Sequence, residues 1–166
     1  MLKPKNIYNS PTKGKLTVKE IISDISDFIN QDTRYPYRII IGSDSQNHKQ
    51  SEFVAAIIVH RVGNGARYYF QRLKTPRIID LRPRIYEEAM LSIAVASTLF
   101  KELEKELDKL YNLAQKPELE IHIDIGRTGK TRELIKEVVG MIQGNGYTCK
   151  IKPDSFGASK VADRYT

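Results

Sequence analysis

Apolar residues recur at two different spacings along the chain, and each spacing predicts a type of secondary structure. Between residues 18 and 30 they fall every three or four positions, which predicts an amphipathic helix. Residues 83–114 carry a second and longer stripe of this kind, beginning with a proline that suits the first turn of a helix. Residues 132–143 predict a third helix, which a Gly-Asn-Gly sequence closes.

Strands are predicted where β-branched and other apolar residues follow one another without helical spacing. The predicted strands cover residues 38–46, 52–62, 66–74, 118–125 and 147–152. A Gly-Asn-Gly turn between the second and third predicts a hairpin, so the first three form an antiparallel meander. Helices precede the last two, which predicts parallel pairing through right-handed crossovers. The order is β-β-β-α-β-α-β, an α/β fold for which we expect helices on both faces of the sheet.

Residues 1–36 form an N-terminal extension ahead of this pattern. Residues 1–16 are polar and rich in turn-forming residues, and we expect no regular structure there. Thr17 and Glu20 have the spacing of a capping box and mark the start of the helix at 18–30. We expect this extra helix to pack on the main sheet, within one domain spanning residues 1–166.

The composition is typical of a globular cytoplasmic protein. Of 166 residues, 40% are hydrophobic and 28% are charged. No apolar run approaches the roughly 20 residues of a membrane span, and the N-terminus lacks the apolar centre of a signal peptide. Cys149 is the only cysteine, which excludes a disulfide framework and a cysteine-based zinc site.

The net charge of +7 favours a polyanionic partner, and its distribution points to nucleic acid. One basic stretch holds a single acid, Asp80. The cations of this stretch are Arg72, Lys74, Arg77, Arg82 and Arg84. An ordinary solvated surface is the alternative interpretation.

Residues 124–131 read D-I-G-R-T-G-K-T, which superficially matches a phosphate-binding P-loop. That motif requires a glycine where Asp124 stands, and an acid there would repel phosphate. We therefore expect a turn followed by the start of a helix.

Two strands end near an aspartate, and this pattern is the strongest chemical signal in the chain. Asp44 follows R-I-I-I-G-S, where the first strand loses its apolar character, and Asp124 has a similar setting in the fourth strand. An isolated aspartate at a strand end more often begins a turn. Two such strands, however, can bring both carboxylates to one edge of a sheet.

Three motifs make the chain resemble the YkuK-type ribonuclease-H-like family. They are P-T-K-G-K-L-T at 11–17, G-S-D-S-Q at 42–46 and P-D-S-F-G-A-S-K-V-A-D-R-Y-T at 153–166. The resemblance implies a ribonuclease-H-like fold with an extra N-terminal helix. It also implies a nuclease that hydrolyses phosphodiester bonds of RNA or DNA with two divalent ions, Mg²⁺ or Mn²⁺.

The resemblance further implies which acids hold the metals. Carried over by position, Asp44 is the central ligand and Asp124 the second. The third is a glutamate early in the long helix, where Glu87 and Glu88 compete. At about 100° per residue, Glu88 lies on the flank of the apolar stripe and Glu87 points to solvent, which favours Glu88. Stabilisation of the helix dipole by both acids is the alternative.

The fourth ligand that the resemblance implies lies in the last segment. Asp154 and Asp163 are the candidates, and we favour Asp163 because superfamily members place their last acid on a C-terminal helix. Carboxylate oxygens suit Mg²⁺, and two such ions activate a hydroxide and stabilise the leaving oxygen.

Two other functions fit the sequence. One is a non-catalytic nucleic-acid-binding module on the same fold, since fold does not fix function. The other is a self-associating interaction protein, in which the projecting end of the long helix, residues 101–114, forms a homodimer interface. His122 alternates with two isoleucines and shares a strand side with Asp124, and we expect it to be a core residue or to support a ligand.

Overall fold

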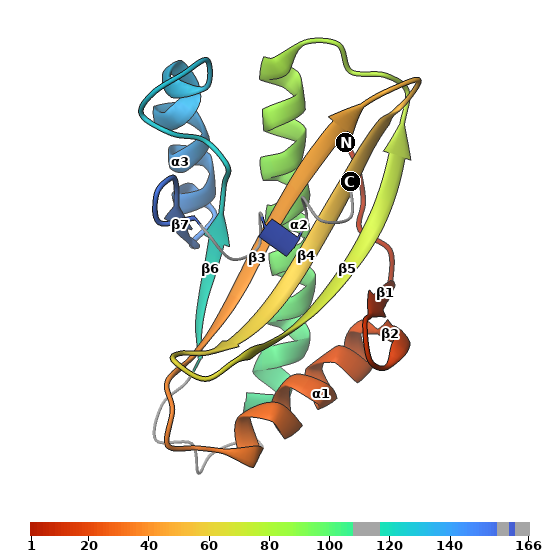
Figure 1. The fold of residues 1–166 in the computed structure, drawn as a ribbon, viewed down its shortest axis with the longest axis vertical. Coiled ribbons are helices and arrows are strands. Elements are labelled where there is room, and N and C mark those ends of the chain that lie inside the picture. Colours follow the sequence, from red (N-terminus) through yellow and green to blue (C-terminus); the bar gives the residue numbers. More distant parts are fainter. Residues whose placement is uncertain (108–116, 156–159, 162–166) are drawn as a thin grey trace.

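The computed structural model describes residues 1–107, 117–155 and 160–161 (Figure 1). These residues form a seven-stranded mixed sheet in the order β2-β1-β5-β4-β3-β6-β7. The strands are β1 (Ile7–Ser10), β2 (Gly14–Thr17), β3 (Tyr37–Asn47), β4 (Ser51–Arg61), β5 (Ala66–Thr75), β6 (Glu118–His122) and β7 (Thr148–Lys150). The helices are α1 (Val18–Gln31), α2 (Leu81–Leu107), a 3₁₀ turn at Arg132–Leu134 and α3 (Ile135–Gly144).

The meander predicted from the sequence is present as β3, β4 and β5. β3 pairs with β4 over its whole length, and β4 pairs with β5, both antiparallel. β6 lies parallel to β3 and β7 lies parallel to β6, as the intervening helices predicted. The parallel pairing of β3 stops at Gly42, which faces His122. Beyond Gly42, the part of β3 that carries Asp44 therefore pairs with β4 alone among the described residues.

The N-terminal segment contains a β-hairpin where no regular structure was expected. β1 and β2 pair antiparallel, and β1 joins the edge of the sheet through one pair, Asn9 with Phe70 of β5. Strands this short are difficult to predict, because only Tyr8 is buried and the apolar alternation is too brief to recognise. The predicted capping box is confirmed, with Thr17 and Glu20 bonded reciprocally at the start of α1.

All three described helices pack on the same face of the sheet. Their buried apolar residues form one core with alternate residues of β3 and β4, such as Ile39 and Ile41. Figure 1 shows α2 running behind the central strands. The crossover from β5 to β6, which contains α2, and that from β6 to β7, which contains α3, advance in the same direction across the sheet, so right-handed connections place α2 and α3 on one side. The expectation of helices on both faces is wrong for these three.

On the opposite face, Ile40 and Ile58 form a smaller apolar cluster with Val161, which packs against them. Lys160 and Val161 are helical, but the end of the chain after them is not described. Asp163 therefore lies outside the described residues, and so does the distal half of the candidate dimer segment at 101–114. None of the described helices is long and apolar enough to cross a membrane.

Candidate carboxylate site

Asp44 lies on the face of β3 that is turned away from the three helices. Ile39 and Ile41 point into the helix-covered core, and Asp44 shares the opposite side with Ile40, because side chains alternate along a strand. Its carboxylate is half-buried, and the residue pairs with Val54 of β4. β6 has ended at this point, so among the described residues the segment around Asp44 pairs only with β4.

Glu88 provides such a side chain from the second turn of α2. Its side chain is only 8% exposed. The hydroxyl of Ser43 donates a hydrogen bond of 2.7 Å to the backbone carbonyl of Glu88, and Ser45 donates to its carboxylate Oε1. Ser92 lies 3.0 Å from Ser43, Oγ to Oγ. Small hydroxyl residues thus hold the start of α2 against β3 and fix the position of this carboxylate.

The electrostatics of Glu88 show that two aspartates act on it. Burial and, to a lesser extent, the negative charges of Asp44 and Asp124 raise the pKa of Glu88 to about 8. The hydrogen bond from Ser45 and the charge of Arg84 oppose this shift. Asp44 and Asp124 therefore both lie within electrostatic reach of Glu88, although the three acids come from a strand, a helix and a loop.

Asp124 is placed two residues beyond the end of β6. It is exposed, and its Oδ1 lies 2.8 Å from Nζ of Lys152, which follows β7. Backbone bonds continue the β6–β7 pairing to this point, from Lys152 N to the carbonyl of Ile125 at 2.9 Å. The ammonium group of Lys152 thus neutralises the acid that stands second in the predicted site. Sequence analysis missed this ion pair, because its partners are far apart in the chain and no spacing rule connects them.

A hollow of about 570 Å³ adjoins this ion pair, lined by residues 126–128 and 151–154. Asp154 lies here in a tight turn, where its amide donates to the carbonyl of Ile151 at 2.8 Å. The segment from Gly126 to Thr131 is a turn followed by the 3₁₀ start of the next helix, which confirms the prediction for the P-loop-like stretch.

Glu87 differs from its expected role as a solvent-facing acid. It is half-buried, and its Oε1 accepts a hydrogen bond from the backbone amide of Leu2. Glu87 does not face solvent, because the N-terminal segment passes over the start of α2. The geometry of the helix alone could not predict this contact. Glu87 is thus bonded to Leu2, whereas Glu88 interacts with both aspartates.

A buried pair of polar residues lies on the same strand side as Asp124. His122 is 1% exposed, and its Nε2 lies 2.9 Å from Oε2 of Glu120, which is 5% exposed. Burial lowers the pKa of His122, against the effect of the Glu120 hydrogen bond. Nε of Arg38 lies 4.0 Å from Glu120. The prediction of a core or supporting role for His122 agrees with this burial, but Glu120 was missed because its burial comes from tertiary packing.

The donor set suits a hard divalent ion, since it consists of carboxylates whose mutual repulsion a cation would relieve. Among the described residues, no three His, Cys, Asp or Glu side chains are grouped closely enough to hold a metal ion. Asp163, the predicted fourth ligand, lies outside the described residues. Binding of a metal at Asp124 also requires that the ammonium group of Lys152 move away.

The basic stretch lies on β5, on the loop that follows it and on α2, and it is partly neutralised. Glu52 lies 3.8 Å from Nε of Arg72 and 4.0 Å from Nζ of Lys74. Arg82 forms an ion pair of 2.8 Å with Glu137 of α3. The charges of this stretch therefore do not form one uniform basic surface.

Comparisons with known proteins identify the family to which the chain belongs. The family model described as "Ribonuclease H-like" matches residues 20–166, and the chain belongs to this family. The chain is also 31% identical to "Uncharacterized protein YkuK" of Bacillus subtilis (strain 168), over 96% of each sequence. No solved structure matches the chain.

Proposed function

We propose that this protein is a divalent-metal-dependent nuclease that hydrolyses phosphodiester bonds. The observation that carries the proposal is the position of Glu88, which is buried against the end of β3 that carries Asp44 and is held there by Ser43 and Ser45. Burial and the charges of Asp44 and Asp124 raise its pKa to about 8, and functional sites are where such perturbation concentrates. Membership of the ribonuclease H-like family supports the same class of chemistry.

Asp44, Glu88 and Asp124 are the residues that would hold the metal, with Asp163 as the fourth ligand. When bound, a pair of Mg²⁺ or Mn²⁺ ions supplies an activated hydroxide and stabilises the leaving oxygen. Ser45 orients the carboxylate of Glu88 through its hydrogen bond. The buried serine contacts with β3 keep the start of α2 in place beside the strand segment that carries Asp44.

Lys152 has two roles in this proposal. Its ammonium group compensates the charge of Asp124 in the metal-free protein, at 2.8 Å. Once displaced, it lies beside the hollow of residues 126–128 and 151–154, where a substrate phosphate can accept its hydrogen bonds.

The decisive experiment replaces Asp44. Asp44→Asn keeps the size of the side chain but removes a charge, and we expect it to abolish Mn²⁺-dependent cleavage of labelled RNA, DNA and hybrid substrates. Circular dichroism should show an unchanged fold. Asp27→Asn, at an exposed position of α1, is the matched control and should cleave like the wild type. Full cleavage by Asp44→Asn would overturn the proposal.

A nucleic-acid-binding module without catalysis is the second candidate, and the ion pair between Lys152 and Asp124 favours it. In such a module this pair is permanent and the acids need no metal. Nucleic-acid binding that persists in EDTA, with no cleavage of any substrate in Mn²⁺, would support this candidate over the nuclease.

A further inference from the structure

Arg84, at the start of α2, is a half-buried cation that lacks an acceptor. It is the one member of the basic stretch that the fold half-buries, since the other four are exposed. The chain half-buries three further arginines among its described residues, and each of these has an oxygen acceptor within 4.0 Å. They are Arg38, Arg61 and Arg67. The side chain of Arg84 forms no ion pair or hydrogen bond within the described part of the chain.

The guanidinium group of Arg84 is enclosed at one end and open at the other. Its Nε is buried without a hydrogen-bond partner, whereas neither of its Nη groups is buried in this way. The packing around Nε restricts the side chain, and the two Nη groups remain open to solvent as donors. A buried polar atom with no partner is unfavourable, and in a native protein it often marks a functional group or the place of an absent ligand.

The helical register places Arg84 beside the carboxylate site. Ser43 of β3 contacts Ser92 of α2, and Ser45 donates to Glu88, so the helix runs antiparallel to this part of the strand. Arg84 lies one turn before Glu88, about 6 Å along the helix axis and on nearly the same side of the helix. Its positive charge also acts on Glu88, where it opposes the rise of the pKa. The guanidinium group is therefore within electrostatic reach of the acids.

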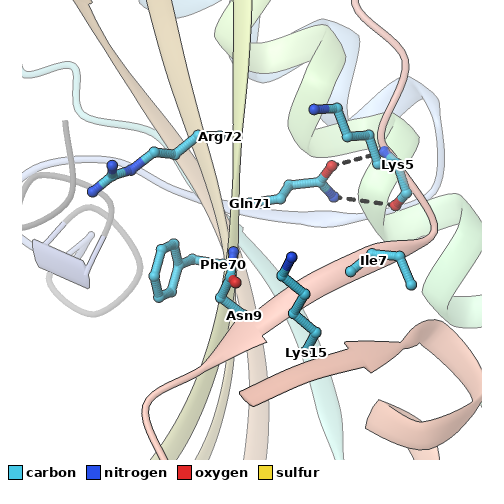
Figure 2. A pocket seen from close by; sticks show the side chains of 7 residues that line it. All are labelled: Lys5, Ile7, Asn9, Lys15, Phe70, Gln71 and Arg72. Atoms are coloured by element: carbon cyan, nitrogen blue, oxygen red, sulfur yellow. Dashed lines mark hydrogen bonds between the residues drawn. The ribbon is translucent and has the colours of Figure 1, made fainter.

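The N-terminal segment helps to fix the start of α2, from which Arg84 extends. The amide of Leu2 donates to Oε1 of Glu87. Three residues later the segment is anchored on β5 by Gln71, whose side chain is 2% exposed. Gln71 accepts from the amide of Lys5 at 2.7 Å and donates to its carbonyl at 3.4 Å (Figure 2). Supporting contacts of this kind are what a binding side chain needs to be held in position before its ligand arrives.

A phosphate has the chemistry of the missing acceptor. A nucleic acid that approaches Asp44, Glu88 and Asp124 brings negative charge toward three acids, and a nearby cation without a partner offsets this repulsion. The planar fork of a guanidinium group also matches two oxygens of one phosphate. Lys152 differs from Arg84 in this respect, because its ammonium group already pairs with Asp124 at 2.8 Å.

We propose that Arg84 binds a backbone phosphate of the nucleic-acid substrate through its Nη groups, beside the acids that would hold the metals. This role deepens the proposed function, on which it rests for the class of ligand. It assigns one cation of the basic stretch to the carboxylate site itself. The alternative is a structural role, in which Arg84 only compensates the charge of Glu88.

The test measures binding of fluorescently labelled single-stranded RNA, single-stranded DNA and their hybrid by anisotropy, at several salt concentrations and in EDTA to prevent cleavage. Arg84→Gln should weaken binding about tenfold and make the slope of log K against log salt shallower by about 0.7 to 0.9, the effect of one lost phosphate contact. Arg84→Lys keeps the charge but not the planar fork, so it should keep the slope and bind less tightly than the wild type. Lys19→Gln, which removes the same charge from an exposed position of α1, is the matched control.

A second series separates phosphate binding from compensation of Glu88. In the Glu88→Gln background that charge is absent, so a purely compensating Arg84 would have no remaining role. We expect Arg84→Gln to weaken binding about tenfold in this background as well. Equal affinities of Glu88→Gln and the double variant would show that Arg84 acts only through Glu88, and would overturn the proposed contact.

Two further outcomes would overturn the contact between Arg84 and phosphate. One is wild-type affinity of Arg84→Gln, and the other is absence of binding by the wild type to all three nucleic acids. The proposed nuclease is tested separately. A wild type that binds nucleic acid through Arg84 but cleaves none in Mn²⁺ would contradict the nuclease and leave the contact in place. Cleavage by Arg84→Gln with the KM and kcat of the wild type would contradict the contact alone.

Discussion

Glu88 is the residue whose chemistry depends most on its surroundings. Its carboxylate is buried against β3, with Ser45 as its hydrogen-bond donor and two aspartates in electrostatic reach. Ionisation of this group places a third negative charge in a partly desolvated site. In the absence of a cation, the folded protein therefore favours the protonated form of Glu88, and a bound cation would reverse this preference.

This preference predicts an unusual dependence of stability on pH. The pKa of Glu88 is about 8 in the folded protein, above the ordinary value of 4.5 for a glutamate. Between these values the folded state binds more protons than the unfolded state, so the contribution of Glu88 is fully present below pH 4.5 and is lost as pH rises through 8. In EDTA, we expect the free energy of unfolding to decrease across this window, by at most about 1.4 kcal/mol per pH unit from this group.

Urea denaturation of Glu88→Gln at pH 5, 6.5 and 8 checks this prediction. With a neutral side chain, the free energy of unfolding should decrease less as pH rises. The variant should therefore become more stable relative to the wild type at higher pH. Glu133→Gln, at an exposed position of the 3₁₀ turn, should follow the wild-type curve. Parallel curves for Glu88→Gln and the wild type would show that Glu88 is ionised throughout the range.

At the scale of elements, Asp24 connects α1 to the N-terminal hairpin and to β5. Its side chain is 5% exposed. It accepts hydrogen bonds from Lys13 in the hairpin turn, from Tyr69, and from Arg67 at 3.0 Å. Burial opposes ionisation of Asp24, but the bonds from Lys13 and Tyr69 and the nearby cationic charges outweigh it and lower its pKa. A single buried carboxylate thus connects three elements that also share the apolar core.

Removal of this carboxylate should destabilise the protein strongly. Asp24→Ala leaves Arg67 and the hydroxyl of Tyr69 without their acceptor, and we expect a loss of about 3 kcal/mol in the free energy of unfolding. Asp27→Ala, at an exposed position of the same helix, should change it by less than about 0.5 kcal/mol. Equal effects of the two substitutions in urea denaturation would show that the carboxylate contributes nothing specific.

The elements that the sequence predicted well are those with a long periodic pattern. The stripe of α1 and the apolar runs of β3 and β4 each specify their structure locally, and all three are present. The hairpin of β1 and β2 was missed because four-residue strands contain too few alternations to stand out. The face on which α3 packs depends on crossover direction, which no local pattern records.

The same distinction applies to the candidate site. Asp44 and Glu88 could be selected from the sequence, because one ends an apolar run and the other lies on the flank of a helical stripe. Lys152 and Glu120 could not be selected from the sequence. Lys152 meets Asp124, and Glu120 becomes buried, only when β6 and β7 lie beside β3. Tertiary contacts of polar residues leave no periodic trace in a sequence.

At the scale of the whole molecule, the sheet order brings the strands of the two candidate aspartates side by side. β3 lies near the centre of the sheet and carries Asp44, and β6 next to it leads to Asp124. On the other side of β3, Asp44 lies in register with Val54 of β4 and Arg72 of β5.

Divalent ions should stabilise the folded molecule if the three acids form their site. A ligand that binds only the folded state, present at 100 times its dissociation constant, adds about 2.7 kcal/mol to the free energy of unfolding. We expect Mn²⁺ to raise the melting temperature of the wild type relative to EDTA, and Asp44→Asn to lose most of this increase. Lys152→Gln should show a larger increase than the wild type at low Mn²⁺ concentration, because no ammonium group then competes with the metal for Asp124. Calorimetry at increasing Mn²⁺ concentrations measures the melting temperatures of the wild type and of both variants. An equal increase in all three proteins would place the bound ion away from Asp44 and Asp124, which would contradict the proposed role of the carboxylate site.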